Sequence, residues 1–170
     1  GIDLTGLAVI FGFLSVGIGF GLQNITSNFI SGLIVLFERP ISVGDRVMVN
    51  GIEGDVQEIN IRSTMVKTLD NISIIVPNSE FVSKDVVNYS HGDPTYRLSI
   101  DVGVAYGSDV DTVVKALDEV AKESESVLDH PEHDIHLRSF GDSSWDMKLL
   151  AWIPDVKKKY VIQNELNQAI

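Results

Sequence analysis

The first part of the chain is an almost unbroken run of apolar positions. Residues 4–22 read LTGLAVIFGFLSVGIGFGL, in which only Thr5 and Ser15 are polar. A helix of these 19 residues is roughly 28 Å long, which matches the thickness of the hydrocarbon core of a bilayer. A secretory signal peptide would have a basic start and a shorter apolar region, whereas Asp3 precedes this one. The pattern therefore predicts a transmembrane helix rather than a signal peptide or a buried helix of a soluble protein.

The uncharged stretch continues past this helix. Residues 4–37 carry no formal charge, and a straight helix of that length, roughly 51 Å, is too long to cross a bilayer once. We expect a kink at the polar pair Gln23–Asn24. Beyond it, apolar residues recur at helical spacing and predict an amphipathic half along the membrane interface: Ile25, Phe29, Leu33 and Leu36. Arg39 is expected to anchor the end of this half at the interface, before Pro40.

Three glycines of the apolar helix suggest packing between helices. Gly17, Gly19 and Gly21 distribute small surfaces around the helix, and small residues let membrane helices approach closely. A loosely packed single helix is the alternative. The same glycines begin like the dinucleotide fingerprint G-x-G-x-x-G, but Leu22 stands at the third glycine position and no strand–turn–helix pattern surrounds them. We therefore expect no bound cofactor.

From residue 41 to residue 90 the pattern changes to short strands. An apolar stretch at 47–49 is followed by Asn50–Gly51, a strong hairpin signal. Two alternating stretches follow at 56–61 and 64–69, and an apolar strand at 72–76 ends at Pro77–Asn78. Short strands at this spacing predict a small β barrel or sandwich.

The last part of the chain mixes strands and helices. Residues 98–104 alternate as a half-buried strand. Ser108 and Asp111 resemble a capping box, and apolar residues from Val110 to Ala121 form one face of the helix that follows. Two strands are expected at 135–140 and 145–153, and a final helix begins near Val156. The order β-α-β-β-α suggests a ferredoxin-like sandwich.

Charge and composition narrow the functions that are possible. The chain has 24 acidic and 13 basic residues and a net charge of −11, which argues against a nucleic-acid partner because phosphate binding needs clustered Lys and Arg. There is no cysteine, so the chain has no disulfide, thiolate metal site or cysteine nucleophile.

Two segments contain residue types that could form a metal site or a catalytic site. His130, His133 and His136 lie within HPEHDIH, but Pro131 favours a loop, and spacings of three along an extended chain do not converge on a metal. We expect a solvent-exposed acidic loop there. Residues 142–144 read DSS without a G-x-S-x-G elbow. We therefore expect neither a metal site nor a catalytic site, and we do not expect an enzyme.

One long segment carries a family resemblance. It reads GIGFGLQNITSNFISGLIVLFERPISVGDRVMVNGIEGDVQEINIRSTMVKTLDNISIIVPNSEFVSKDVVNYS, and it resembles the signature region of small-conductance mechanosensitive (MscS-type) channels. It is most similar to the branch whose pore helix carries G-x-G-F-G-L-Q. A weaker continuation covers VGVAYGSDVDTV and FGDSSWDMKLLAWI.

The resemblance implies a membrane protein of the α+β class with three parts. Residues 1–37 would form a pore-lining transmembrane helix with a kink near 23–24 and an interfacial half. Residues 38–90 would form an Sm-like β domain, and residues 91–170 a ferredoxin-like α+β domain whose C-terminal end is incomplete. Members of the family carry at least two membrane helices before the pore helix, so we expect this chain to be part of a longer protein.

The resemblance also implies a function. It predicts a homoheptameric channel that membrane tension opens and that releases ions and small solutes under hypo-osmotic shock. The channel would lie among the lipids of the inner membrane, with residues after about 38 in the cytoplasm. Two apolar residues of the family's closed pore match Val16 and Phe20, which lie at i and i+4 on one helix face. Asn24 stands where some relatives have the glycine of the kink.

Two other functions remain open from the sequence. An Sm-like barrel also occurs in RNA-binding proteins, so a membrane-tethered RNA-binding module is one alternative, although residues 41–90 lack a basic–aromatic patch. A membrane scaffold without a conducting pore is the other.

Overall fold

The structure is a computed structural model that describes residues 4–170. It divides between Asn88 and Tyr89 into two compact units, which are described in turn.

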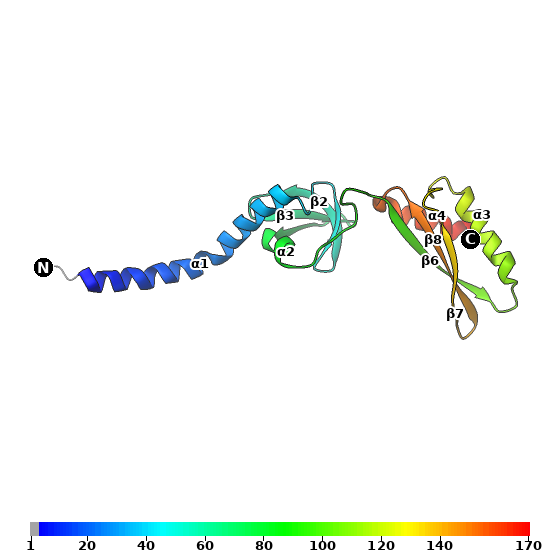
Figure 1. Cartoon of the computed structure of the whole chain (residues 1–170), viewed down its shortest axis with the longest axis horizontal. Helices are drawn as coiled ribbons and strands as arrows, with labels where there is room; N and C mark the ends of the chain where they lie inside the picture. Colours follow the sequence, from blue (N-terminus) through cyan, green and yellow to red (C-terminus); the bar gives the residue numbers. More distant parts are fainter. Residues whose placement is uncertain (1–3) are drawn as a thin grey trace. The chain divides into compact units, whose positions relative to one another are not determined.

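The N-terminal unit begins with the long helix α1 (Leu4–Glu38). Among residues 4–170 it is the one helix that is long and apolar enough to cross a membrane. The chain is helical throughout this range, including at Gln23–Asn24, and Figure 1 shows that the helix axis changes direction near its middle. At its end Arg39 adopts a left-handed φ of 52° and its N–H donates to the Val35 carbonyl at 3.0 Å, which closes the last turn.

A five-stranded antiparallel sheet follows α1. Its elements are β1 (Arg46–Val49), β2 (Ile52–Ile59), β3 (Ser63–Thr68), β4 (Ser73–Pro77), the short helix α2 (Asn78–Ser83) and β5 (Val87–Asn88), and the strand order is β4-β3-β2-β1-β5. The predicted hairpin is confirmed, because Val49 pairs with Ile52 across Asn50–Gly51. Both turn residues have positive φ, at 51° and 76°, as a turn of this kind requires.

The sequence prediction was incomplete in this unit. The strand expected at 56–61 begins at Ile52 and ends at Ile59. It begins earlier because its pairing with β1 continues up to the Asn50–Gly51 turn. The short helix α2 and the two-residue strand β5 were not predicted, because neither is long enough to show a period. The hydrophobic core joins helix and sheet through these residues: Val35, Ile41, Val47, Val49, Val56, Val66, Val76 and Phe81.

The C-terminal unit is a three-stranded sheet with helices on one face (Figure 1). Its elements are β6 (Tyr96–Ala105), α3 (Val110–Glu123), β7 (Asp134–Phe140), β8 (Ser144–Ile153), the 3-10 turn η1 (Val156–Lys158) and α4 (Lys159–Ala169). The sheet order is β6-β8-β7 and both pairings are antiparallel, so the predicted order β-α-β-β-α is confirmed. The core combines residues of the sheet with residues of both helices: Leu98, Ile100, Ala121, Leu149, Ala151, Ile153, Ile162 and Leu166.

Two expectations in this unit were wrong in detail. The cap of α3 is Asp109 rather than Ser108, because the Asp109 carboxylate accepts from the Thr112 N–H at 2.9 Å. The segment HPEHDIH is a loop only in its first part, because β7 begins at Asp134, one residue before the strand that was expected at 135–140.

Candidate pore helix and its junction with the β sheet

The first half of α1 exposes large apolar side chains. Val16 is 58% exposed and Phe20 is 75% exposed, and Phe13 is 77% exposed. A monomeric soluble protein rarely exposes a contiguous apolar surface of this length. The surface therefore needs lipid or other helices to cover it.

The three glycines of the predicted packing set lie in this exposed half. A Cβ added at Gly17, Gly19 or Gly21 would meet nothing within 4 Å. No contact within the described chain therefore requires glycine at these positions. Their role in packing against other helices stays a prediction.

The predicted kink pair lies next to a polar junction. The Asn28 side chain donates from Nδ2 to the Asn24 carbonyl at 2.8 Å, and its Oδ1 accepts from the Ser79 N–H of α2 at 3.0 Å. A side chain that bonds the carbonyl four residues earlier competes with the helix backbone and favours bending. Asn28 thus links the Asn24 carbonyl to the β domain through one amide group.

One helical turn later, α1 approaches the sheet at Gly32. A Cβ at this position would lie 2.2 Å from the Ile61 carbonyl oxygen and 2.6 Å from the Asn78 Nδ2. Only glycine permits so close an approach of helix and loop. Three residues further, Val35 is fully buried in the core of the unit.

Asn78 holds the loop that Gly32 contacts. Its side chain is fully buried and donates from Nδ2 to the carbonyls of Asn60, at 2.9 Å, and Ile61, at 3.1 Å. Its Oδ1 accepts from the Thr64 hydroxyl at 2.9 Å. Because every polar atom of the buried amide has a partner, the loop before β3 is fixed beneath α1.

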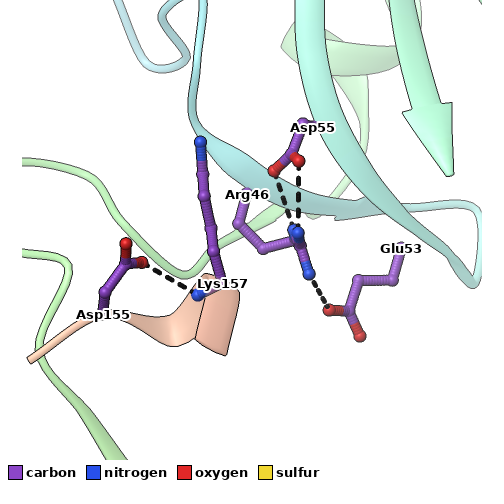
Figure 2. A network of polar contacts seen from close by, with 5 residues as sticks. All are labelled: Arg46, Glu53, Asp55, Asp155 and Lys157. Atoms are coloured by element: carbon purple, nitrogen blue, oxygen red, sulfur yellow. Dashed lines mark hydrogen bonds and ion pairs between the residues drawn. The ribbon is translucent and has the colours of Figure 1, made fainter. Parts of the chain in front are cut away.

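A buried arginine ties β1 to β2 on the same sheet (Figure 2). The side chain of Arg46 is 3% exposed and lies in a forked contact with Asp55, with Nε–Oδ1 at 2.8 Å and Nη2–Oδ2 at 3.1 Å. Its Nη1 lies 3.1 Å from Glu53 Oε1. The hydrogen bonds to Asp55 raise the pKa of Arg46 above its ordinary value. Figure 2 also draws Asp155 of the C-terminal unit, whose carboxylate accepts from the Lys157 N–H at 2.9 Å.

The remaining predicted site residue is Arg39. It is exposed and follows α1 directly, in the left-handed conformation that ends the helix. Its role as an interface anchor stays a prediction. The sequence analysis missed Asn28, Gly32 and Asn78, although a polar residue and a glycine on the same face as the buried Val35 could have indicated a close helix contact.

One histidine of the segment HPEHDIH, His133, joins a cluster of charged side chains on α3. His133 Nε2 lies 2.9 Å from Asp118 Oδ1, and Lys122 Nζ lies 2.7 Å from the other oxygen. Both contacts lower the pKa of Asp118 below its ordinary value, and the hydrogen bond from Lys122 has the larger effect. Within residues 4–170 no group of three or more His, Cys, Asp or Glu side chains is arranged to hold a metal ion.

Two family models match the chain. The β-domain model of mechanosensitive ion channels covers residues 24–91, and the C-terminal model of the mechanosensitive ion channel MscS covers residues 98–170. Their boundary lies close to the division of the structure after Asn88.

Curated proteins and solved structures agree with these matches. The chain is 42% identical to the mechanosensitive channel MscK of Escherichia coli over 86% of its length, and 40% identical over its whole length to an uncharacterized MscS family protein of Haemophilus influenzae. It spans only 13% and 15% of those two proteins.

The closed-state crystal structure of Helicobacter pylori MscS has the same fold. The match covers 99% of this chain and 66% of the Helicobacter pylori chain, with a TM-score of 0.90 and 24% sequence identity. Together, the apolar helix, the β domain, the α+β domain and the matches to both family models show that this chain belongs to the MscS family of mechanosensitive ion channels.

Proposed function

We propose that the full-length protein is an ion channel that membrane tension opens, and that it releases ions and small solutes under hypo-osmotic shock. The observation that carries this proposal is the contrast between the two halves of α1. The first half exposes its apolar surface, including Phe20 at 75%, whereas the second half is held to the rest of the β domain at Asn28, Gly32 and Val35. A helix with one end free to move in the membrane and the other fixed suits a tension sensor.

The same helix is the reason to expect that the protein forms an oligomer. One helix cannot enclose a water path, so the protein functions as a homo-oligomer, with seven copies as the family resemblance implies. Gly17, Gly19 and Gly21 would then lie where neighbouring pore helices meet. The protein would lie in the inner membrane, in contact with its lipids, with the residues after about 38 in the cytoplasm.

The gate is a narrow apolar ring. Val16 and Phe20 lie one turn apart on the same face of α1, and in the assembled ring each would contribute one layer. A narrow ring of apolar side chains does not hold a continuous water column, so ions would have to lose their hydration to pass. Tension would separate the helices until the ring becomes wet. The kink at Gln23–Asn24 would let the first half tilt, while Arg39 keeps the second half at the interface.

Two measurements on the purified full-length protein test this proposal. Native mass measurement in detergent should give one closed ring, and patch recordings from reconstituted membranes should show currents that begin under suction. A stable monomer without tension-activated current would contradict the proposal and favour a membrane scaffold. Measurable RNA binding by the full-length protein would favour the Sm-like RNA-binding alternative.

A further inference from the structure

A lysine is buried against three aromatic rings at the start of α4. Lys159 is 9% exposed, and its Nζ lies 4.8 Å from the ring centre of Tyr160, 5.2 Å from that of Tyr89 and 5.7 Å from that of Tyr96. Removing an ammonium group from water is unfavourable unless other groups compensate for the loss. Tyrosine ring faces attract cations within about 6 Å, and the attraction is strongest where water is excluded.

Two of the three rings lie at the two ends of the segment between β5 and β6. Tyr89 is the first residue after β5, and Tyr96 is the first residue of β6. Their rings also contact each other edge to face, with centres 6.1 Å apart. Between them, the Pro94 carbonyl accepts from the Val156 N–H of η1 at 2.9 Å. Residues 89–96 are therefore held to the start of α4 at both ends and near Pro94.

The composition of this segment would otherwise make it a flexible linker. Residues 90–94 read SHGDP, and Gly92 has a positive φ of 75°. Such a stretch has little apolar side chain to bury and would remain mobile without other contacts. Asn88, the last residue of the N-terminal unit, is fixed there, because its Nδ2 donates to Asp45 Oδ2 at 2.7 Å and to the Pro40 carbonyl at 3.1 Å.

We propose that Lys159 and its three tyrosines form a cation clasp that makes residues 89–95 an ordered part of the C-terminal unit. The C-terminal unit is then ordered from its first residue, Tyr89, onward. The clasp depends on a positive charge at position 159 and on aromatic rings around it. It goes beyond channel function, since it holds whether or not the protein conducts ions.

Hydrogen exchange of the full chain in detergent, followed by mass spectrometry, tests the clasp. Lys159→Met keeps the length of the side chain and removes the charge, and the amides of residues 90–95 should then exchange at least about tenfold faster. Lys159→Arg keeps a cation over the rings and should stay within about twofold of the unmodified chain. Lys158→Met is the matched control, because Lys158 is an exposed neighbour and should have no effect.

A second pair of variants covers the case in which Lys159→Met does not fold. Tyr160 is half-exposed, at 50%, so its replacement should be tolerated. Tyr160→Leu should speed exchange in residues 90–95, whereas Tyr160→Phe, which keeps the ring, should not. Unchanged exchange in Lys159→Met and in Tyr160→Leu would overturn the clasp. An equal increase in Lys158→Met would also overturn it, because the effect would then follow from charge alone.

Discussion

The side-chain oxygen of Asn28 in α1 accepts a hydrogen bond of 3.0 Å from the backbone N–H of Ser79 at the start of α2. The amide nitrogen of the same side chain donates to the Asn24 carbonyl at 2.8 Å. One residue thus joins the carbonyl at the predicted kink to the β domain. A change in the direction of the helix at this point has to stretch or break one of the two bonds.

Asn28→Ala should release this junction. The Ser79 N–H loses its partner, and the free energy of unfolding should fall by about 1–3 kcal/mol, measured by chemical denaturation in detergent. Hydrogen exchange at Ser79 should become faster. Asn28→Asp is the control, because a carboxylate still accepts from Ser79 but cannot donate to the Asn24 carbonyl. If Ser79 exchanges as fast in Asn28→Asp as in Asn28→Ala, the side-chain oxygen is not what protects it.

Gly32→Ala should weaken the packing of α1 on the sheet. The new methyl group would lie 2.2 Å from the Ile61 carbonyl oxygen, and backbone must move to make room. We expect a loss of about 1–3 kcal/mol in the free energy of unfolding. Gly12→Ala on the same helix is the matched control, because a Cβ there meets nothing within 4 Å. Equal stabilities of the two variants would show that the close approach at Gly32 is not a constraint.

Phe20→Ser should open the proposed gate more easily. A hydroxyl in the narrow ring favours water, so the full-length channel should open at lower tension or leak at rest in patch recordings. Phe13→Ser is a closely matched comparison, since the two side chains are similarly exposed, at 75% and 77%, and it should have a smaller effect. If Phe13→Ser opens the pore and Phe20→Ser does not, the gate lies about two turns nearer the N-terminus of α1, because seven residues are close to two full turns of a helix.

The charge of the chain after α1 predicts an ion preference. Residues 38–170 hold 23 acidic and 13 basic residues. If these acids line the cytoplasmic path, they enrich cations near the pore. Reversal potentials of the full-length channel should then show a mild cation preference that fades near 1 M salt, where the Debye length is about 3 Å. A clear anion preference would mean that the acids face away from the path.

The interactions of Asp118 with Lys122 and His133 predict that the stability of the C-terminal unit depends on pH. Lys122 and His133 lower the pKa of Asp118 below its ordinary value of 3.8, so the ionised carboxylate favours the folded state. This contribution is present above that ordinary value and is lost as the pH falls through the lowered value. Asp118→Asn should therefore lose less thermal stability than the unmodified chain when the pH is lowered from about 5 to about 2. Parallel pH profiles of the two proteins would exclude this contribution.

Much of the fold was predictable because it depends on local patterns. The uncharged stretch of residues 4–37 predicted α1, and Asn50–Gly51 predicted the β1–β2 hairpin. Each signal lies within a few neighbouring residues. The helix α2 was missed because it is stabilised by distant residues, including the buried Asn78, whose partners Asn60 and Thr64 come from other parts of the chain.

The sequence by itself determined that the chain has a membrane-length apolar helix followed by a strand-rich and then a mixed part, since hydrophobic periodicity and turn residues are local properties. Only the tertiary structure decided which residues of the helix are attached to the sheet. Asn28, Gly32 and Val35 share one face of α1, but what that face contacts is not known until the positions of Ser79 and Ile61 are known. In the same way, the chemistry of Lys159 depends on rings that lie far apart in the sequence. Contacts between distant residues depend on how the elements pack in three dimensions, and no local pattern along the chain records them.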